Sequence, residues 1–168
     1  MKTSRGELIH EMVFNALLAA IYVVLTVVIS PLSYGAIQFR FSEFLVLFCF
    51  WNKRYTIGLA LGCLIANIFS PMAALDIPFG TLATLLACCC IMYSKWLLLA
   101  LTFPVVFNAF IVAGELAIIG EPYWMSVLTV GAGEAAVMAG SYIVLLAMKK
   151  SKTFYKVIRA TQNLEYKF

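Results

Sequence analysis

The stretch from Val13 to Ile29, VFNALLAAIYVVLTVVI, and the stretch from Leu97 to Phe107, LLLALTFPVVF, are apolar on every face. A membrane-spanning β-strand alternates apolar and polar residues, so these runs disfavour a β-barrel and favour helices that cross a membrane. The whole chain agrees: 64% of its 168 residues are hydrophobic, 12% are charged and the mean hydropathy is +0.98. Soluble domains are about half apolar and a quarter charged. The sequence therefore predicts an all-α, polytopic membrane protein.

Glycine, proline and charged residues divide the apolar part of the chain into six segments. Residues 12–148 leave room for about six crossings of roughly 20 residues each. We expect six transmembrane helices at about 10–30, 41–52, 55–69, 79–93, 96–119 and 123–148. The second and third are short for a full crossing, so one of them is expected to extend, tilt or kink. Residues 1–168 are thus predicted to form a single integral membrane domain, with a basic tail at 149–168.

The basic residues predict the orientation of this domain, because Lys and Arg in short loops are retained on the cytoplasmic side. Six helices place both termini on one side. That side then holds eleven of the twelve Lys and Arg residues, namely Lys2, Arg5, Lys53, Arg54, Lys95, Lys149, Lys150, Lys152, Lys156, Arg159 and Lys167. Only Arg40 lies opposite. Both termini are therefore expected to be cytoplasmic, the net charge of +4 reflects topology rather than a nucleic-acid partner, and the tail is expected near anionic lipid headgroups.

Three polar side chains interrupt the last two apolar segments. Such groups cost a few kcal/mol inside a bilayer, so those that remain usually face a cavity or a partner. Asn108 and Glu115 are seven residues apart and share a face of their helix, with Glu115 towards the outer end. Glu134 lies about 16 Å below the start of the next helix. We expect it to meet that face.

Further polar residues gather at the outer ends of the other helices. Asn67 is at the outer end of the third helix, Asp76 is expected in the loop before the fourth, and Gln38, Arg40 and Glu43 are expected in the loop between the first and second. Aromatic neighbours are Phe39, Phe41, Phe79, Tyr123 and Trp124. Carboxylates accept adjacent N–H groups, amides both donate and accept, and aromatic faces stack on a flat ring or hold a cation. The set suits a planar, hydrogen-bonding and cationic solute.

A purely structural role is the alternative, in which Glu115 and Glu134 pair with Arg40 or backbone groups and hold helices together. The functional interpretation is favoured because a single outer cation leaves at least one carboxylate for a ligand. The chain has no G-x-x-x-x-G-K-[ST] loop, no H-E-x-x-H, no G-x-S-x-G and one His. Its five cysteines lack C-x-x-C spacing. We therefore expect no enzyme, metal ion or cofactor, and energy for uphill transport must come from a partner or an ion gradient.

Three parts of the sequence resemble the QueT family. They are GAIQFRFSE at 35–43, GCLIANIFSP at 62–71 followed by LDIPFGTLATL at 75–85, and the helix pattern from Asn108 to Glu115. The resemblance covers nearly all of residues 10–150. Members of this family are S-components of energy-coupling factor (ECF) transporters and capture queuosine precursors.

The resemblance implies a six-helix substrate-binding subunit of an ATP-driven uptake transporter in the bacterial cytoplasmic membrane. Its partners would be the transmembrane scaffold EcfT and the ATPases EcfA and EcfA'. Ala16 and Ala20 match the small-x-x-x-small stripe on the first helix that contacts the scaffold in such modules, and the loop from Pro31 to Phe41 would close over the solute. The implied ligand is a 7-deazaguanine such as preQ1, or queuine.

On this hypothesis one carboxylate binds the N1–H and 2-amino edge of the ring and another binds the aminomethyl ammonium of preQ1. Glu115 and Glu134 are the first choices, with Asp76 or Glu43 as substitutes nearer the entrance. Asn108 or Gln38 would serve the O6 or N7 face, and Arg40 would hold the loop or bind O6.

Two other functions remain open. The first is a proton-coupled transporter of small organic cations that needs no ATPase and exchanges protons at Glu115 or Glu134. The second is a membrane enzyme acting on a lipid or isoprenoid, against which the missing paired Asp motifs argue.

Overall fold

The computed structural model describes residues 5–34 and 38–167. Within these ranges the chain is helical, with no strand beyond one isolated bridge between Trp96 and Lys167. The elements, where η denotes a 3₁₀ helix, are α1 (Arg5–Val28), α2 (Ser30–Ser33), η1 (Phe41–Phe50), η2 (Lys53–Tyr55), α3 (Thr56–Ile68), α4 (Ala73–Tyr93), α5 (Leu97–Ile118), α6 (Tyr123–Met148) and α7 (Lys152–Val157). The all-α prediction is confirmed.

Four of the described helices, α1, α4, α5 and α6, are long and apolar enough to cross a membrane. The 13 residues of α3 rise about 20 Å, and the ten residues of η1 also rise about 20 Å because a 3₁₀ helix is more extended. Both are shorter than a hydrocarbon layer of about 30 Å. The prediction of a multi-pass membrane protein holds, while two of the six expected spans fall short of full length.

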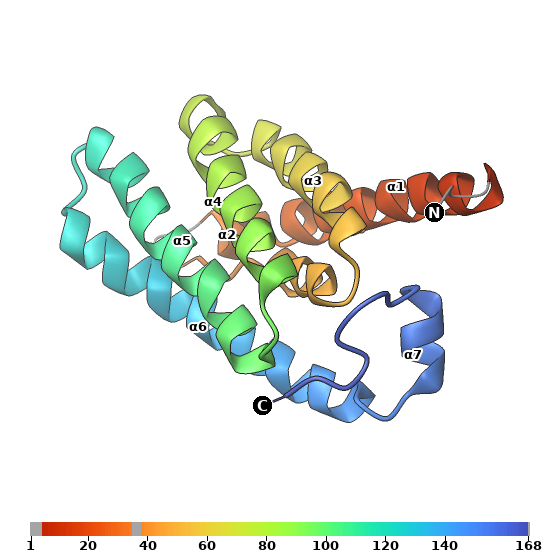
Figure 1. Ribbon diagram of the computed structural model, residues 1–168. Helices are drawn as coiled ribbons and strands as arrows, with labels where there is room; N and C mark the ends of the chain where they lie inside the picture. Colours follow the sequence, from red (N-terminus) through yellow and green to blue (C-terminus); the bar gives the residue numbers. More distant parts are fainter. Residues whose placement is uncertain (1–4, 35–37, 168) are drawn as a thin grey trace.

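The 3₁₀ helix η1 lies at the centre of the bundle. It contacts each of α1, α3, α4, α5 and α6, and these five pack in the order α1–α3–α4–α5–α6 around it (Figure 1). Leu47 and Phe50 at its core-facing positions have no exposed surface, and the same is true of Glu43 in its first turn. The central position of η1 therefore carries a carboxylate into the middle of the molecule.

Two glycines of α3 let it approach α1 closely. A Cβ atom at Gly58 would lie 2.6 Å from the backbone oxygen of Asn15, and one at Gly62 would lie 2.9 Å from Cα of Ala19. The Gly58 N–H donates to Oδ1 of Asn15 at 2.8 Å. This contact uses one face of α1 and leaves Ala16 and Ala20 exposed on another.

The fourth helix begins earlier than predicted. It starts at Ala73 rather than residue 79, so Asp76, which was expected in a loop, lies in its first turn and is 1% exposed. An acidic residue in the first turn is favourable because the helix N-terminus carries a partial positive charge. Pro78 removes one intrahelical hydrogen bond without ending the helix.

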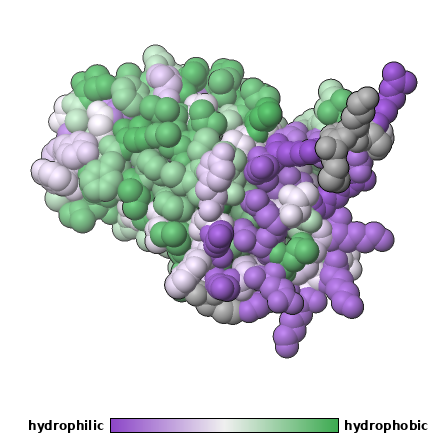
Figure 2. All heavy atoms as spheres, in the orientation of Figure 1, coloured by the Kyte–Doolittle hydropathy of each residue, from purple (hydrophilic) through white to green (hydrophobic). Residues whose placement is uncertain are grey.

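The C-terminal tail is not a loose basic segment. After α7 it folds back over the helix ends near residues 50–55 and 92–96. The Gln162 side-chain amide donates to the carbonyl oxygens of Phe50 at 3.2 Å and Met92 at 3.0 Å, and Asn163 donates to those of Phe50 at 2.8 Å and Ser94 at 3.0 Å. Hydrophilic residues gather at this end, whereas apolar residues cover the face over α4, α5 and α6 (Figure 2).

Candidate functional site

The structure buries all eight residues that the sequence singled out for solute binding, each with at most 3% of its surface exposed. They are Gln38, Arg40, Glu43, Asn67, Asp76, Asn108, Glu115 and Glu134. They come from η1, the segment just before it, α3, α4, α5 and α6. Glu43, which was expected in the outer loop where the second helix begins, lies in the first turn of η1, and η1 is inserted into the bundle.

Arg40 anchors one group of these side chains. Its Nη2 atom donates to Oδ1 of Asn67 at 3.3 Å and lies 3.9 Å from Oδ1 of Asp76. Asn67 in turn donates to the backbone oxygen of Asp76 at 2.8 Å, and the Ser70 hydroxyl donates to the Asp76 carboxylate. The Nε and Nη1 atoms of Arg40 have no partner within the described ranges. Two of its donor groups therefore remain available.

A second group surrounds Glu43. Its Oε1 atom accepts hydrogen bonds from the Tyr22 hydroxyl of α1 and from the Thr84 hydroxyl of α4, the latter at 3.1 Å. Nearby, the Thr26 hydroxyl donates to the Ser42 hydroxyl at 2.7 Å. The sequence analysis missed Tyr22, Thr26 and Thr84. The spacing of Tyr22 and Thr26, which places both on one face of an apolar helix, was the available signal.

The third group, on α5 and α6, consists of Asn108, Glu115 and Glu134. Both polar atoms of the Asn108 amide and both oxygens of Glu115 and of Glu134 are buried without a partner among the residues described. Glu115 interacts electrostatically with Asp76 and Arg40, and Glu134 with Glu43 and Arg40. Proximity of both carboxylates to Arg40 is also what the purely structural alternative requires. Within the described residues, neither carboxylate accepts a hydrogen bond from Arg40 or from the backbone.

These three groups give an uneven balance of charge. Four buried carboxyl groups, those of Glu43, Asp76, Glu115 and Glu134, surround the single guanidinium of Arg40. A buried carboxylate is stable only when it is paired, hydrogen-bonded or protonated. Arg40 cannot pair with all four, so the remaining carboxyl groups are either protonated or receive N–H groups and positive charge from a ligand.

Two glycines make room for the site. A Cβ atom at Gly80 of α4 would lie 2.8 Å from Nδ2 of Asn67 and 3.5 Å from Nη1 of Arg40. A Cβ atom at Gly133 of α6 would overlap the backbone carbonyl of Gln38. Gly133 therefore lets the segment before η1 rest directly on α6, next to Glu134.

A hollow of about 320 Å³ lies at the end of the bundle formed by α2, the start of α6 and the end of α5. Gln38, Tyr34, Met125, Ser126 and Thr129 contribute to its wall. The Tyr34 hydroxyl donates to the backbone oxygen of Ala66 at 2.6 Å, and burial raises the pKa of Tyr34 to about 12, so it stays a neutral donor. Because Gln38 lines this hollow and also contacts Gly133, the hollow is a candidate entrance to the buried site.

The aromatic surroundings differ from those expected. Trp124 is 70% exposed and Phe41 is 45% exposed, because they point away from the buried polar groups towards the surface of the bundle. The rings that meet the buried polar groups are those of Tyr22, whose hydroxyl donates to Glu43, and Tyr34, whose centre lies 5.7 Å from Cζ of Arg40. The loop expected from Pro31 to Phe41 includes residues 35–37, which lie outside the described residues.

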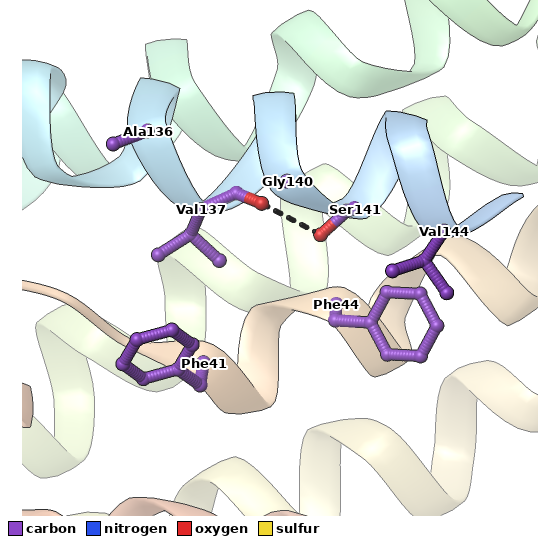
Figure 3. Close-up of a pocket in the computed structure, with 7 residues that line it drawn as sticks. All are labelled: Phe41, Phe44, Ala136, Val137, Gly140, Ser141 and Val144. Carbon is purple, nitrogen blue, oxygen red and sulfur yellow. Dashed lines mark hydrogen bonds between the residues drawn. The ribbon is translucent and has the colours of Figure 1, made fainter.

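A second hollow, between η1 and α6, is unsuited to a polar solute (Figure 3). Phe41 and Phe44 face Val137 and Val144 across it, and its one side-chain hydroxyl, that of Ser141, donates to the Val137 backbone oxygen at 2.7 Å. In the described ranges no group of three or more His, Cys, Asp or Glu residues is arranged to hold a metal ion. The buried polar groups near Arg40 are thus the best candidate for ligand binding.

Comparison with known proteins identifies the family of the chain. The family model for QueT transporters matches residues 12–150. The queuosine precursor transporter QueT of Lactococcus lactis subsp. cremoris is 44% identical over 78 residues, which is 45% of this chain and 46% of that protein. The match therefore spans about half the length of that relative. No solved structure matches the chain significantly. Since the family model covers the chain from α1 to the end of α6, this protein belongs to the QueT transporter family.

Proposed function

We propose that the chain is the substrate-binding subunit of an ECF-type uptake transporter and that it captures a queuosine precursor, a 7-deazaguanine such as preQ1 or queuine. The observation that carries this proposal is the excess of buried carboxyl groups over buried cations, of which Arg40 is the only one in the part of the chain that the structure describes. Membership of the QueT transporter family and the name of the Lactococcus lactis relative support the substrate class.

The hydrogen-bonding capacity of the site matches such a ligand. Asp76 and Glu43 each have one oxygen that already accepts a hydrogen bond, whereas both oxygens of Glu115 and of Glu134 have no partner in the described ranges, so Glu115 and Glu134 are the first choices for the ligand. One would accept from the N1–H and 2-amino edge, and the other would pair with the aminomethyl ammonium of preQ1. The unpartnered Asn108 amide and the free N–H groups of Arg40 would serve the O6 and N7 face.

We further infer that all six segments, α1, η1, α3, α4, α5 and α6, cross the membrane as one domain with both termini in the cytoplasm. The tail contacts residues 50–55 and 92–96, so the segments that are expected to be cytoplasmic lie together at one end of the bundle. Tyr34, Gln38 and Met125 line a common hollow at the expected outer end. A short η1 suits this topology because the flanking helices cover it on several sides.

The energy would come from partner proteins, an EcfT scaffold and EcfA and EcfA' ATPases. Helix α1 offers a surface for the scaffold, since only 17% of the residues in its most apolar 18-residue stretch are buried. Ala16 and Ala20 are exposed there, beside the exposed side chains of Leu17 and Ile21. Co-purification of the chain with these three proteins, and its loss in Ala16→Trp/Ala20→Trp, tests this assignment. Uptake by the chain alone in liposomes under a pH gradient would contradict it and favour the proton-coupled alternative.

Equilibrium binding to the detergent-purified chain, without partners, tests the substrate. PreQ1, queuine, guanine and adenine are titrated into the wild type, into Glu115→Gln and into Glu165→Gln, which removes an exposed carboxylate from the opposite end. We expect selective binding of a 7-deazaguanine, lost in Glu115→Gln and kept in Glu165→Gln. Equal affinities for all four compounds, or equal effects of both variants, would overturn the proposed site.

A further inference from the structure

A separate hollow lies at the basic end of the molecule, away from the buried carboxylates. Its volume is about 420 Å³, and the end of α6, α7 and the C-terminal tail form it. The side chains that matter for what it could hold are Lys149, Lys150, Lys167, Tyr155, Tyr166 and Leu164. The candidate solute site uses none of them.

The walls of this hollow are held in place by hydrogen bonds. The Tyr166 hydroxyl donates to the backbone oxygen of Leu145 in α6 at 2.6 Å, and the Tyr155 hydroxyl donates to that of Lys149 at 2.9 Å. The Leu97 N–H donates to the Lys167 backbone oxygen at 2.9 Å, which ties the tail to the start of α5. Burial raises the pKa of Tyr166 to about 12, so its hydroxyl keeps the proton that it donates. The three lysines are therefore brought together by a folded segment.

The charge of the hollow is positive. Three lysines line it and Glu165 is its one acidic residue, which leaves two positive charges. Lys150 and Lys167 are exposed, and Nζ of Lys149 lies 5.3 Å from the centre of the Tyr166 ring. Ammonium groups around a concave surface attract a phosphate-type anion, because each ammonium offers charge-assisted N–H donors.

Its apolar surroundings indicate that the anion is the headgroup of a lipid. Leu164, in the wall, is 56% exposed, and the turn of α6 next to the hollow exposes Ile143 and Val144. Trp96 is 56% exposed at the start of α5, and exposed aromatic residues of this kind collect at the membrane–water interface. A soluble phosphate would interact only with the lysine ammonium groups. A phospholipid would place its headgroup among the lysines and also its acyl chains along α6.

We propose that this hollow binds the headgroup of an anionic phospholipid and thereby fixes the C-terminal tail against the membrane surface. The proposal rests on the chain lying in a membrane and not on the identity of its solute. Basic clusters next to a membrane helix are the usual recognition elements for anionic lipids.

Native mass spectrometry of the full chain in detergent tests the proposal, with dioleoyl phosphatidylglycerol as the probe and dioleoyl phosphatidylcholine as the neutral comparison. The test variant is Lys149→Gln/Lys150→Gln/Lys167→Gln. The matched control, Lys53→Gln/Lys95→Gln/Lys152→Gln, removes the same charge from the same end outside the hollow. Since one lysine near an anionic surface contributes roughly fivefold, the test variant should lose phosphatidylglycerol affinity by about a hundredfold and the control by less than about fivefold.

Two further measurements distinguish a lipid headgroup from a free phosphate and a loss of charge from a loss of fold. The corresponding triple Lys→Arg variant should retain binding, and 10 mM inorganic phosphate or glycerol 3-phosphate should fail to displace the lipid. If the triple Gln variant does not fold, Lys150→Gln, which changes one exposed side chain, carries the test with an expected loss of roughly fivefold. Three results would overturn the proposal. They are equal binding of the two lipids, equal losses of lipid affinity in the test and control variants, and displacement of the lipid by free phosphate. Solute binding should be unchanged throughout, so failure here is distinguishable from failure of the proposed transport function.

Discussion

The buried polar side chains on α1, η1, α3 and α4 bond to one another, whereas Asn108, Glu115 and Glu134 on α5 and α6 have no hydrogen-bond partner in the described part of the chain. Both sets are equally inaccessible, since Glu43 and Glu134 each have 0% of their surface exposed. Burial therefore does not separate a structural carboxylate from a binding one. The presence or absence of partners does, because leaving a buried polar group unpaired costs free energy that a ligand can recover.

Arg40→Met should have the largest effect, because it leaves the carboxyl groups of both sets without a cation. We expect a loss of about 3–5 kcal/mol in the free energy of unfolding and no measurable solute binding. Arg54→Met is the control, since Arg54 pairs with Glu11 at an exposed position and should cost less than about 1 kcal/mol. Thermal unfolding in detergent compares the two, and equal losses would remove Arg40 from the centre of the site.

Glu134→Gln should separate binding from stability. Removing a desolvated charge that pairs with the ligand should weaken solute binding by about 2–5 kcal/mol. The unliganded protein should unfold at the same or a higher temperature, because the substitution removes an unpaired buried carboxylate. Calorimetric titration and a thermal melt on the same sample check both expectations. A large drop in Tm with intact binding would instead assign Glu134 to helix packing.

Gly133→Ala should disturb the contact between the two sets. The added methyl group meets the Gln38 carbonyl, and overpacking of this kind costs about 1–3 kcal/mol. Gly114→Ala is the matched control, because a Cβ atom there meets nothing within 4 Å and should leave stability unchanged or slightly improved. Solute affinity and Tm should both fall only in Gly133→Ala, and identical behaviour would contradict the close contact of residue 38 with α6.

Tyr22→Phe should have the smallest effect. In contrast to Glu134→Gln, it should lower stability and leave solute affinity nearly unchanged. Glu43 loses one hydrogen bond but keeps that from Thr84, so the free energy of unfolding should fall by about 1 kcal/mol. Solute affinity should change by less than about threefold, a difference well below 1.4 kcal/mol. A tenfold loss of affinity would show instead that Tyr22 belongs with the ligand-binding residues.

The sequence predicted which polar residues are buried better than it predicted the helices around them. Polar residues in apolar helices are costly, which is why Asn108, Glu115 and Glu134 stood out and are indeed buried. Their environment could not be predicted, because it depends on η1 entering the bundle as a 3₁₀ helix. Local composition does not distinguish a central helix from a lipid-facing one when both are apolar.

Asp76 and the tail illustrate the same limit. Asp76 follows Pro71 and precedes Pro78, a pattern typical of a loop, yet the helix starts before it and tertiary contacts with Ser70 and Asn67 hold it there. The tail was expected to be a basic segment beside the membrane. The role of Gln162 and Asn163 is set by carbonyls distant in the sequence, so no local pattern reveals it.

The folded tail also sets an order of events during biosynthesis. The carbonyl of Phe50 receives its Asn163 partner from 113 positions downstream, and that of Met92 receives Gln162 from 70 positions downstream. The ribosome has therefore synthesised every helix of the bundle before the carbonyls of Phe50 and Met92 can accept these hydrogen bonds. Closure of that end is a late, post-insertion step, and a chain stalled after α6 would reach the membrane with its helices in place and that end still open.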